Sequence, residues 1–416
     1  MSIFTGSTTV NDTFFAPVLG LAEGSKHWRP CPELPDEDWL LLNLHRVLEA
    51  VPSGRAFLQE HGPRFRRQPS RTNYFGSLAS GRRAALAADV NLALIRANPL
   101  EDRLAGIPEL SRYRCFATDG HWHGPAVHDP KDKHGALAAV GHFYSLDLHD
   151  HFLRHLSTAQ TAHEHDMPAL KRLKPTGLRQ GVPKGTRVLL VHDRAGIDFR
   201  FWKRCRQECA VYFLSRVKER MVFSTLSERE VCRRDPRNRG VVADRKVRSL
   251  EGHELRIVVY REPGTGNEYQ FLTNEPDLPP GVIAELYRRR WEIEKVFDEL
   301  KNRLSGQRAW GSSLTAKESQ GQLLAMAHNL MHIYRSRLGS MQEVVDQAEI
   351  RRRTDRIRQL DQVAKANNRP ASSLLLRIRE ATQLSVKFIR WLRQSIRDNA
   401  TEAAAVPRLN SLLASL

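Results

Sequence analysis

The sequence predicts an α/β protein whose sheet lies in the middle of the chain, with helical regions before and after it. A short unbroken apolar run, Val188–Val191, is typical of a central strand with both faces covered. Strand-like and helix-like segments alternate between residues 111 and 217. Residues 79–98 and 315–337 carry the apolar spacing of helices. Together these observations favour a sheet flanked by helices.

The composition indicates a nucleic acid partner. The chain has 416 residues, with 65 Lys and Arg against 47 Asp and Glu, which gives a formal net charge of +18. Such an excess repels itself unless a polyanion relieves it, and phosphates neutralised by Lys and Arg release counterions that drive binding. On charge alone, a merely soluble basic protein or one that touches acidic membranes is the alternative.

Several compartments and classes are disfavoured. Five cysteines with no Cys-x-x-Cys pair give poor support for a disulfide framework or a structural zinc site. The N-terminal residues lack the pattern of a signal peptide, and no apolar run approaches the ~20 residues that span a bilayer. We therefore expect a cytoplasmic, nucleoid-associated protein with no membrane partner. At roughly 100–200 residues per domain, the length suggests about two to four domains.

Residues 1–110 are predicted to form a helical DNA-binding region. Residues 1–33 are rich in Thr, Gly and Pro and resemble a poorly ordered lead-in, whereas residues 36–60 and 79–98 have helical spacing. Basic residues interleaved with aromatics lie between the two helical segments and suit a surface that holds phosphates. The candidates for DNA contact there are Arg66, Arg67 and Arg71. A solvated charged loop is the alternative.

The central region, residues 111–217, has a recognisable order of elements. The expected strands are residues 114–123, 124–129, 140–148, 186–193 and 211–217, and the expected helices are residues 161–173 and 197–209. Three strands, a helix, a strand, a helix and a strand is the order of a ribonuclease H-like core. In that topology the first and fourth strands are neighbours.

The rest of the chain completes this plan. Residues 218–275 are a separate block with strand-like pieces at 256–260 and 268–273, joined by a Pro- and Gly-rich turn. We interpret them as a β-rich insertion, after which residues 276–335 return to the core through a long helix at 282–304. Residues 336–416 are expected to be helical and to serve dimerisation or DNA contact.

The long helix carries four polar residues close together. At about 100° per residue, Tyr287, Arg290, Glu294 and Lys301 fall inside an arc of roughly 60°, beside an apolar stripe. An ordinary amphipathic helix with charges on its solvated face is the alternative for this segment taken alone.

Two aspartates are expected to meet that helix. Asp119 and Asp193 end the first and fourth strands, where an open α/β sheet places its ligands. Each could instead be an ordinary turn or loop cap, and Asp129 and Asp132 are weaker alternatives for the first position. Asp119, Asp193 and Glu294 would repel one another without a cation, and oxygen ligands suit Mg²⁺ or Mn²⁺. Two such ions about 4 Å apart can support phosphoryl transfer.

The spacing Tyr, two residues, Arg, three residues, Glu, six residues, Lys is matched by Tyr287, Arg290, Glu294 and Lys301. In this the chain resembles bacterial insertion-sequence transposases of the family named after insertion sequence 4. Asp119-Gly120 and Asp193-Arg194 are similar to that family's first and second aspartate motifs.

The resemblance implies a DDE catalytic core in which Asp119, Asp193 and Glu294 hold two metal ions. Activated water would release a 3′-OH at the end of the element, and this 3′-OH would attack target DNA. Tyr287, Arg290, Lys301 and Arg194 would contact DNA. The implied partners are the terminal inverted repeats, target DNA and a second copy of the chain in a synaptic complex.

Two features lie outside this pattern. Some relatives form a DNA hairpin and stack a flipped base on a tryptophan of the insertion, but residues 218–275 contain no tryptophan. Phe223, Tyr260, Tyr269 or Phe271 could stack a base instead. The histidines at 121, 123, 149, 151, 155, 163 and 165 are expected on a polar surface or near DNA, with zinc binding as the alternative.

Two other functions fit parts of the pattern. A structure-specific nuclease or resolvase could use the same metal site without joining DNA ends. A domesticated DNA-binding protein would need no converging acids, so the three carboxylates argue against it.

Overall fold

The computed structural model describes residues 8–51, 53–64, 69–129, 131, 139–161, 164–179, 181–263, 265–338, 359, 362, 366 and 373–414. The chain forms two compact units. Glu101–Glu294 make up the sheet unit, and Met1–Leu100 with Lys295–Leu416 make up the helical unit. Within the described residues, no helix is both long and apolar enough to cross a membrane.

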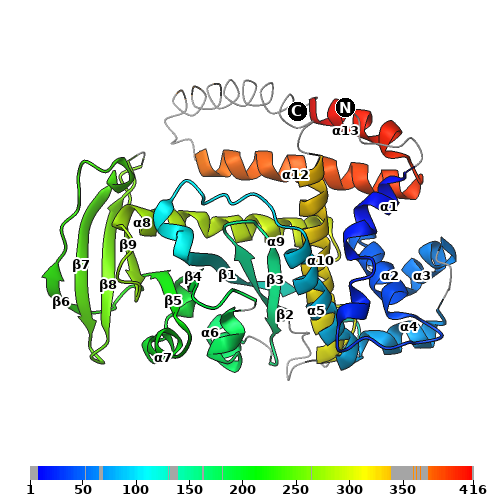
Figure 1. The fold of residues 1–416 in the computed structure, drawn as a ribbon, viewed down its shortest axis with the longest axis horizontal. Coiled ribbons are helices and arrows are strands. Elements are labelled where there is room, and N and C mark those ends of the chain that lie inside the picture. Colours follow the sequence, from blue (N-terminus) through cyan, green and yellow to red (C-terminus); the bar gives the residue numbers. More distant parts are fainter. Residues whose placement is uncertain are drawn as a thin grey trace. The chain divides into compact units, whose positions relative to one another are not determined.

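The sheet unit is built on one sheet of nine strands in the order β3-β2-β1-β4-β5-β9-β8-β7-β6 (Figure 1). The strands are β1 (Tyr113–His123), β2 (Val140–Asp147), β3 (Leu153–Thr158), β4 (Arg187–His192), β5 (Val211–Arg216), β6 (Phe223–Glu228), β7 (Val241–Ser249), β8 (Glu254–Arg261) and β9 (Glu268–Thr273). The prediction of a mixed α/β protein with helical flanks is confirmed.

Strand β1 lies in the middle of the first half of the sheet. It pairs antiparallel with β2 and parallel with β4, and β4 pairs parallel with β5. The prediction that the first and fourth strands are neighbours is therefore confirmed. One predicted strand, residues 124–129, is wrong. The backbone N–H of Ala126 donates to the Asp129 carboxylate at 2.7 Å and closes a turn there, and Leu153–Thr158 is the third strand instead.

Strands β6 to β9 extend the same sheet. Strand β9 pairs antiparallel with β5, and the remaining strands follow as an antiparallel meander that ends at the exposed strand β6. The pieces expected at residues 256–260 and 268–273 correspond to β8 and β9.

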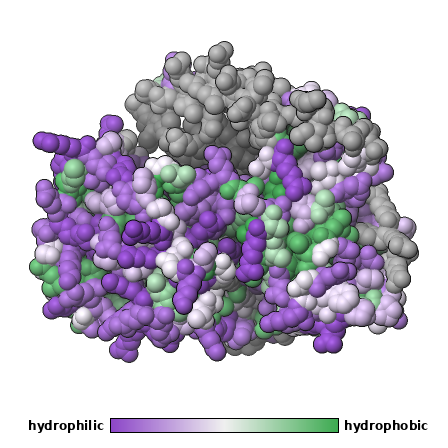
Figure 2. Space-filling view, viewed as in Figure 1, coloured by the Kyte–Doolittle hydropathy of each residue, from purple (hydrophilic) through white to green (hydrophobic). Residues whose placement is uncertain are grey.

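Helices cover the two faces of this sheet. Helices α6 (Asp166–Arg172) and α7 (Phe199–Cys209) pack on one face, and α8 (Pro280–Arg289) packs on the other, where Tyr287 contacts Phe271 (Figure 1). Hydrophilic residues dominate the outer surface seen in Figure 2, in keeping with the charged composition.

The core beneath α6 and α7 centres on Trp202, which is 0% exposed. Its ring stacks on Phe213 with 5.3 Å between ring centroids and 2° between planes. Its indole N–H donates to the carbonyl of Gly196 at 3.1 Å. Trp202 therefore joins α7 both to strand β5 and to the turn that follows β4.

The helical unit contains α1 (Val10–Phe15), α2 (Asp36–Glu49), α3 (Gly54–His61), α4 (Arg71–Leu78), α5 (Gly81–Ala97), α10 (Leu314–Arg337), α12 (Ser373–Arg397) and α13 (Glu402–Ala414). Short 3₁₀ turns occur at Ala16–Val18, Ala22–Gly24 and Gly62–Arg64 here, and at Pro108–Arg112, Pro175–Arg179, Arg194–Gly196 and Pro236–Asn238 in the sheet unit. Helix α9 (Trp291–Arg303) runs across the boundary between the units.

Three expectations about these helices need correction. The described part of the lead-in is packed, because Phe14 and Phe15 of α1 are buried. The helix expected at 36–60 is two helices, since Ala50 adopts a left-handed conformation with φ of 54° and ends α2. The helix expected at 282–304 is also divided, at Arg290. There the backbone hydrogen bonds Arg290 N–H to Tyr287 and Ile293 N–H to Arg290 span three residues instead of four.

We predict that Trp202→Ala destabilises the sheet unit by about 3–5 kcal/mol, because it removes a fully buried ring and leaves a cavity. The free energy of unfolding, measured by urea denaturation, tests this. Leu250→Ala is the control, since Leu250 is 83% exposed in a turn and its truncation changes stability by no more than about 0.5 kcal/mol. Equal losses for the two variants would contradict the assignment of Trp202 as the centre of this core.

Candidate functional site

The parallel pairing of β1 and β4 places two acids side by side. The last pair in register is Thr118 with His192, so Asp119 and Asp193 are the next residues on the two strands. Paired strands lie about 4.8 Å apart. Strand β1 continues to His123, whereas β4 ends, which opens the sheet beside Asp119.

Asp119 is held from two directions. One carboxylate oxygen accepts the backbone N–H of Gly120 at 2.8 Å. The other accepts the guanidinium of Arg290 at 3.2 Å. The side chain is only 21% exposed.

Asp193 caps the 3₁₀ turn Arg194–Gly196. Its carboxylate accepts the backbone N–H of Ala195 at 2.7 Å, and its backbone carbonyl accepts the hydroxyl of Ser215 on β5 at 2.7 Å. Both contacts fix the chain where it leaves β4, so the position of Asp193 follows from the end of that strand.

Arg290 connects Glu294 to Asp119. While one guanidinium nitrogen donates to Asp119, another donates to Glu294 at 2.8 Å. The Arg290 side chain is 7% exposed, and its charge is therefore largely committed to these two acids. The sequence-predicted residues Asp119, Asp193, Arg290 and Glu294 thus lie around one place in the sheet unit.

Asp166 is a neighbouring acid that sequence reasoning missed. It begins α6, where an acidic residue is common, so its type and position carried no special signal. A Cβ placed on Gly120 would lie 2.9 Å from an oxygen of Asp166 and 3.2 Å from the ring of Phe143. Glycine at position 120 therefore leaves the space that the Asp166 carboxylate occupies beside the site.

The electrostatics of the site oppose ionisation of Asp119 and Asp166. Burial, the nearby Asp166 carboxylate and, less strongly, Asp193 raise the pKa of Asp119 to about 7, although Arg290 acts in the opposite direction. Burial and the charge of Asp193 raise the pKa of Asp166 to about 6. The acids outnumber the cation between them, so a further cation would be stabilised here.

The donors of this site suit a hard divalent cation, because Asp119, Asp193 and Glu294 offer only carboxylate oxygens. In the described parts of the chain, however, no three Asp, Glu, His or Cys side chains are already arranged to hold a metal ion. The guanidinium of Arg290 lies between two of the acids in this structure. Chemically the residues fit Mg²⁺ or Mn²⁺.

The other predicted DNA contacts are distributed over both units. The ring of Tyr287 is half-buried against Phe271, with 4.8 Å between centroids. Arg194 follows Asp193, is 38% exposed and pairs with Glu219 at 3.5 Å. Lys301 is exposed on α9 in the helical unit, and so is Arg71 at the start of α4. Arg66 and Arg67 lie outside the described residues.

The histidines differ from their expected surface positions. His121, His123, His149 and His155 are buried, His151 is partly buried against Glu292, and His165 is exposed. His163 lies outside the described residues. Burial lowers the pKa of His155 to about 3, so this imidazole is neutral near pH 7. The expectation of a polar surface is therefore wrong for the four buried rings. Strands β1 and β3 direct His121, His123 and His155 into the protein. His149 is buried in the turn after β2, where its Nδ1 lies 3.0 Å from the Asp102 carboxylate.

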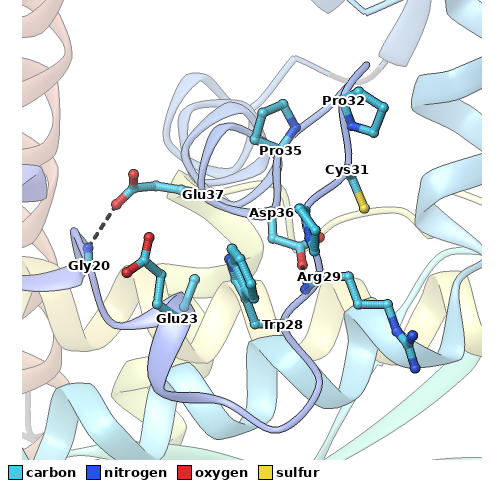
Figure 3. A pocket seen from close by; sticks show the side chains of 11 residues that line it. Gly20, Glu23, Trp28, Arg29, Cys31, Pro32, Pro35, Asp36 and Glu37 are labelled. Carbon is cyan, nitrogen blue, oxygen red and sulfur yellow. Dashed lines mark hydrogen bonds between the residues drawn. The ribbon is translucent and has the colours of Figure 1, made fainter.

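A pocket in the helical unit was not expected from the sequence. It is lined by the segment from Gly20 to Glu37, including Trp28 and Cys31 (Figure 3). The carboxylates of Glu23 and Glu37 lie at its wall, and Glu37 accepts the backbone N–H of Gly20 at 2.8 Å. None of the sequence-predicted site residues lines this pocket, and its acids disfavour a phosphate ligand.

We predict that Asp119→Asn increasingly stabilises the chain, relative to the unchanged protein, as the pH rises. Because the pKa of Asp119 is raised to about 7 by folding, the folded chain keeps a proton that the unfolded chain releases near pH about 4. Stability is therefore lost as the pH rises through this window, and asparagine removes that loss. Urea unfolding with a chelator from pH about 4.5 to 8 should show a relative gain on the order of 2–4 kcal/mol. A difference that stays constant with pH would contradict the raised pKa.

The comparisons with known proteins agree with this geometry. A family model described as a transposase DDE domain matches residues 120–330, about half of the chain. The match begins at the residue after Asp119 and contains both Asp193 and Glu294. No curated protein gives a significant match. The chain therefore belongs to the DDE-domain transposases, enzymes that act on DNA as polynucleotidyl transferases and endonucleases.

Proposed function

We propose that this transposase cleaves the ends of an insertion sequence and joins their 3′-OH ends to target DNA, with Asp119, Asp193 and Glu294 as the catalytic acids. The observation that carries the proposal is the register of β1 and β4, which brings Asp119 beside Asp193, together with the Arg290 bridge from Asp119 to Glu294. We also propose membership of the insertion-sequence-4 family, on the Tyr287, Arg290, Glu294 and Lys301 spacing.

The strand order supports a ribonuclease H-like core for this activity. The first five strands have the order β3-β2-β1-β4-β5, with β2 antiparallel to β1 and with β4 and β5 parallel to it. In the proposed division, residues 111–217 and 276–335 form the core and residues 218–275 form the β-rich insertion. Because β5 pairs directly with β9, the insertion leaves and re-enters the core at the same edge.

Asp119, Asp193 and Glu294 would hold two Mg²⁺ or Mn²⁺ ions. When bound, such ions activate a nucleophile and stabilise the leaving oxygen of a phosphodiester. The chain's own residues prepare the site for this charge. Asp193 is fixed by its cap and by Ser215, and Asp119 is fixed by the backbone of Gly120.

Arg290 has a second role in the proposal. Its guanidinium neutralises Asp119 and Glu294 in this structure. A single phosphate of bound DNA can accept two parallel hydrogen bonds from one guanidinium, a geometry that two separate carboxylates do not offer. We propose that Arg290 turns to the DNA backbone when metal and DNA bind, which frees both acids. Tyr287, packed on Phe271, would present its hydroxyl to the same strand.

The remaining assignments concern the flanks. Residues 1–110, including Arg66, Arg67 and Arg71, are proposed to bind the terminal inverted repeats. Lys301 and Arg194 are proposed as further DNA contacts. Residues 336–416 are proposed to join two copies of the chain, because both ends of an element must be cut in one assembly.

We predict that Glu294→Gln, Asp119→Asn and Asp193→Asn each reduce cleavage of DNA carrying the element's terminal repeats on the order of 1,000-fold or more. The amide keeps the shape of each side chain but removes the charge that holds the cation. The measurement is the rate of 3′-OH release in Mg²⁺ or Mn²⁺, with chelation as a negative control.

Glu285→Gln is the matched control, because Glu285 lies on the neighbouring helix α8 and pairs with Arg288 and Arg289 instead. Its cleavage rate should stay within a few-fold of the unchanged enzyme. Normal cleavage by Glu294→Gln would refute the assignment of the acids. Cleavage without any joining of the 3′-OH to a second DNA would refute transposition and favour a structure-specific nuclease.

A further inference from the structure

Helix α7 presents a row of basic side chains on its outer face. Phe201, Trp202 and Cys205 are buried against the sheet. The exposed residues on the opposite side of the helix include Arg200, Lys203, Arg204 and Arg206. A helix of 11 residues therefore carries four cations, with Glu208 as its exposed acid.

Three of these cations have no ion-pair partner among the described residues. Arg200 lies 3.7 Å from Glu251, a marginal ion pair. Within the described residues, Lys203, Arg204 and Arg206 have no carboxylate within ion-pair distance. The guanidinium carbons of Arg204 and Arg206 lie over aromatic rings, 5.5 Å from the Phe201 centroid and 5.6 Å from that of Tyr212. These rings orient the guanidinium groups without cancelling their charge.

Strand β7 of the same unit shows the contrast. Lys246 and Arg248 are also exposed cations, and Arg245 is half-buried. Arg245 pairs with Glu228, and the other two pair with Glu254. Each cation of β7 thus has a carboxylate partner, although Lys246 and Arg248 share one. The cations of α7 remain available for a partner.

Clefts flank α7 on both sides. One is lined by Arg200 and Arg204, together with Glu251 and the ion pair of Lys171 with Asp198. The other is lined by Lys203 and Arg206, together with Glu254, which pairs with Lys246 and Arg248 of β7. The helix is thus a ridge with basic side chains on each slope. An extended polyanion could contact the helix along its length.

The position of α7 relates this ridge to the candidate site. The helix starts at Phe199, six residues after Asp193, and ends before β5. Its first turn therefore lies near the edge of the sheet where β4 ends. Eleven residues extend roughly 16 Å, which corresponds to roughly five phosphates of one DNA strand.

We propose that the outer face of α7 binds the phosphate backbone of target DNA, through Lys203, Arg204 and Arg206. The inference rests on the proposed function, since it concerns the second DNA of the joining reaction. Lysine and arginine contacts to phosphates carry no sequence information. They suit a DNA that is accepted with many sequences better than an element end that must be recognised.

The test is the variant Lys203→Gln/Arg204→Gln/Arg206→Gln in the full chain, bound to a DNA duplex that lacks the terminal repeats. A plot of log affinity against log salt has a negative slope. Each lost phosphate contact makes this slope less steep by about 0.9, so three lost contacts make it less steep by about 2.7. Fluorescence anisotropy over a salt series measures this slope. We expect strand transfer into target DNA to fall with it, whereas 3′-OH release at element ends is retained.

The matched control is Arg245→Gln/Lys246→Gln/Arg248→Gln, which removes the same charge from ion-paired positions. Circular dichroism checks that both variants are folded. If the α7 variant changes the salt slope no more than the β7 variant does, the proposal is overturned. It is also overturned if the α7 variant weakens binding of element ends as strongly as binding of target DNA. Failure of the proposed function would give a different result. Glu294→Gln would then cleave DNA normally, whatever salt slope the α7 variant shows.

Discussion

The parallel pairing of β1 with β4 is the constraint on which the candidate site depends. Its register sets Asp119 and Asp193 at one level of the sheet. A slip of one residue would turn Asp119 toward the face that carries α6 and α7. The core prevents this slip, because Phe116 and Leu190 must face the buried cluster around Trp202. Packing on one face of the sheet therefore fixes the positions of Asp119 and Asp193.

The register has an electrostatic cost. Asp119, Asp166 and Asp193 are brought within range of one another, and the pKa of Asp119 rises to about 7 as a result of burial and these neighbours. Arg290 compensates in part by bridging Asp119 and Glu294. The break between α8 and α9 falls at this arginine, so the irregular turn and the ion pairs occur at one residue. Such a site is held by the surrounding fold and is suited to receive a cation.

The sequence predicted the parts of this arrangement that follow from local pattern. The apolar run before Asp193 identified a buried strand, and the spacing of Arg290 and Glu294 placed both on one side of a helical segment. Asp166 could not be identified in this way, because an acid at a helix start is ordinary and its approach to Gly120 depends on the packing of α6. The third strand was misplaced for a related reason, since the turn at Ala126–Asp129 is closed by a side chain.

The packing of the sheet also determines where charged side chains lie in the sheet unit. Acids that approach one another lie at the ends of β1 and β4. Lys203, Arg204 and Arg206, which have no ion-pair partner in the described part of the chain, lie on the outer face of α7, whose inner face is fixed by Trp202 and Phe201. Cations on the surface attract a polyanion over several ångströms, and buried acids repel its phosphates unless metal ions intervene. In the proposed function, binding of DNA by this surface and reaction at the acids are therefore separable steps. The first would depend on net charge and salt, and the second on the divalent cation that the acids are proposed to hold.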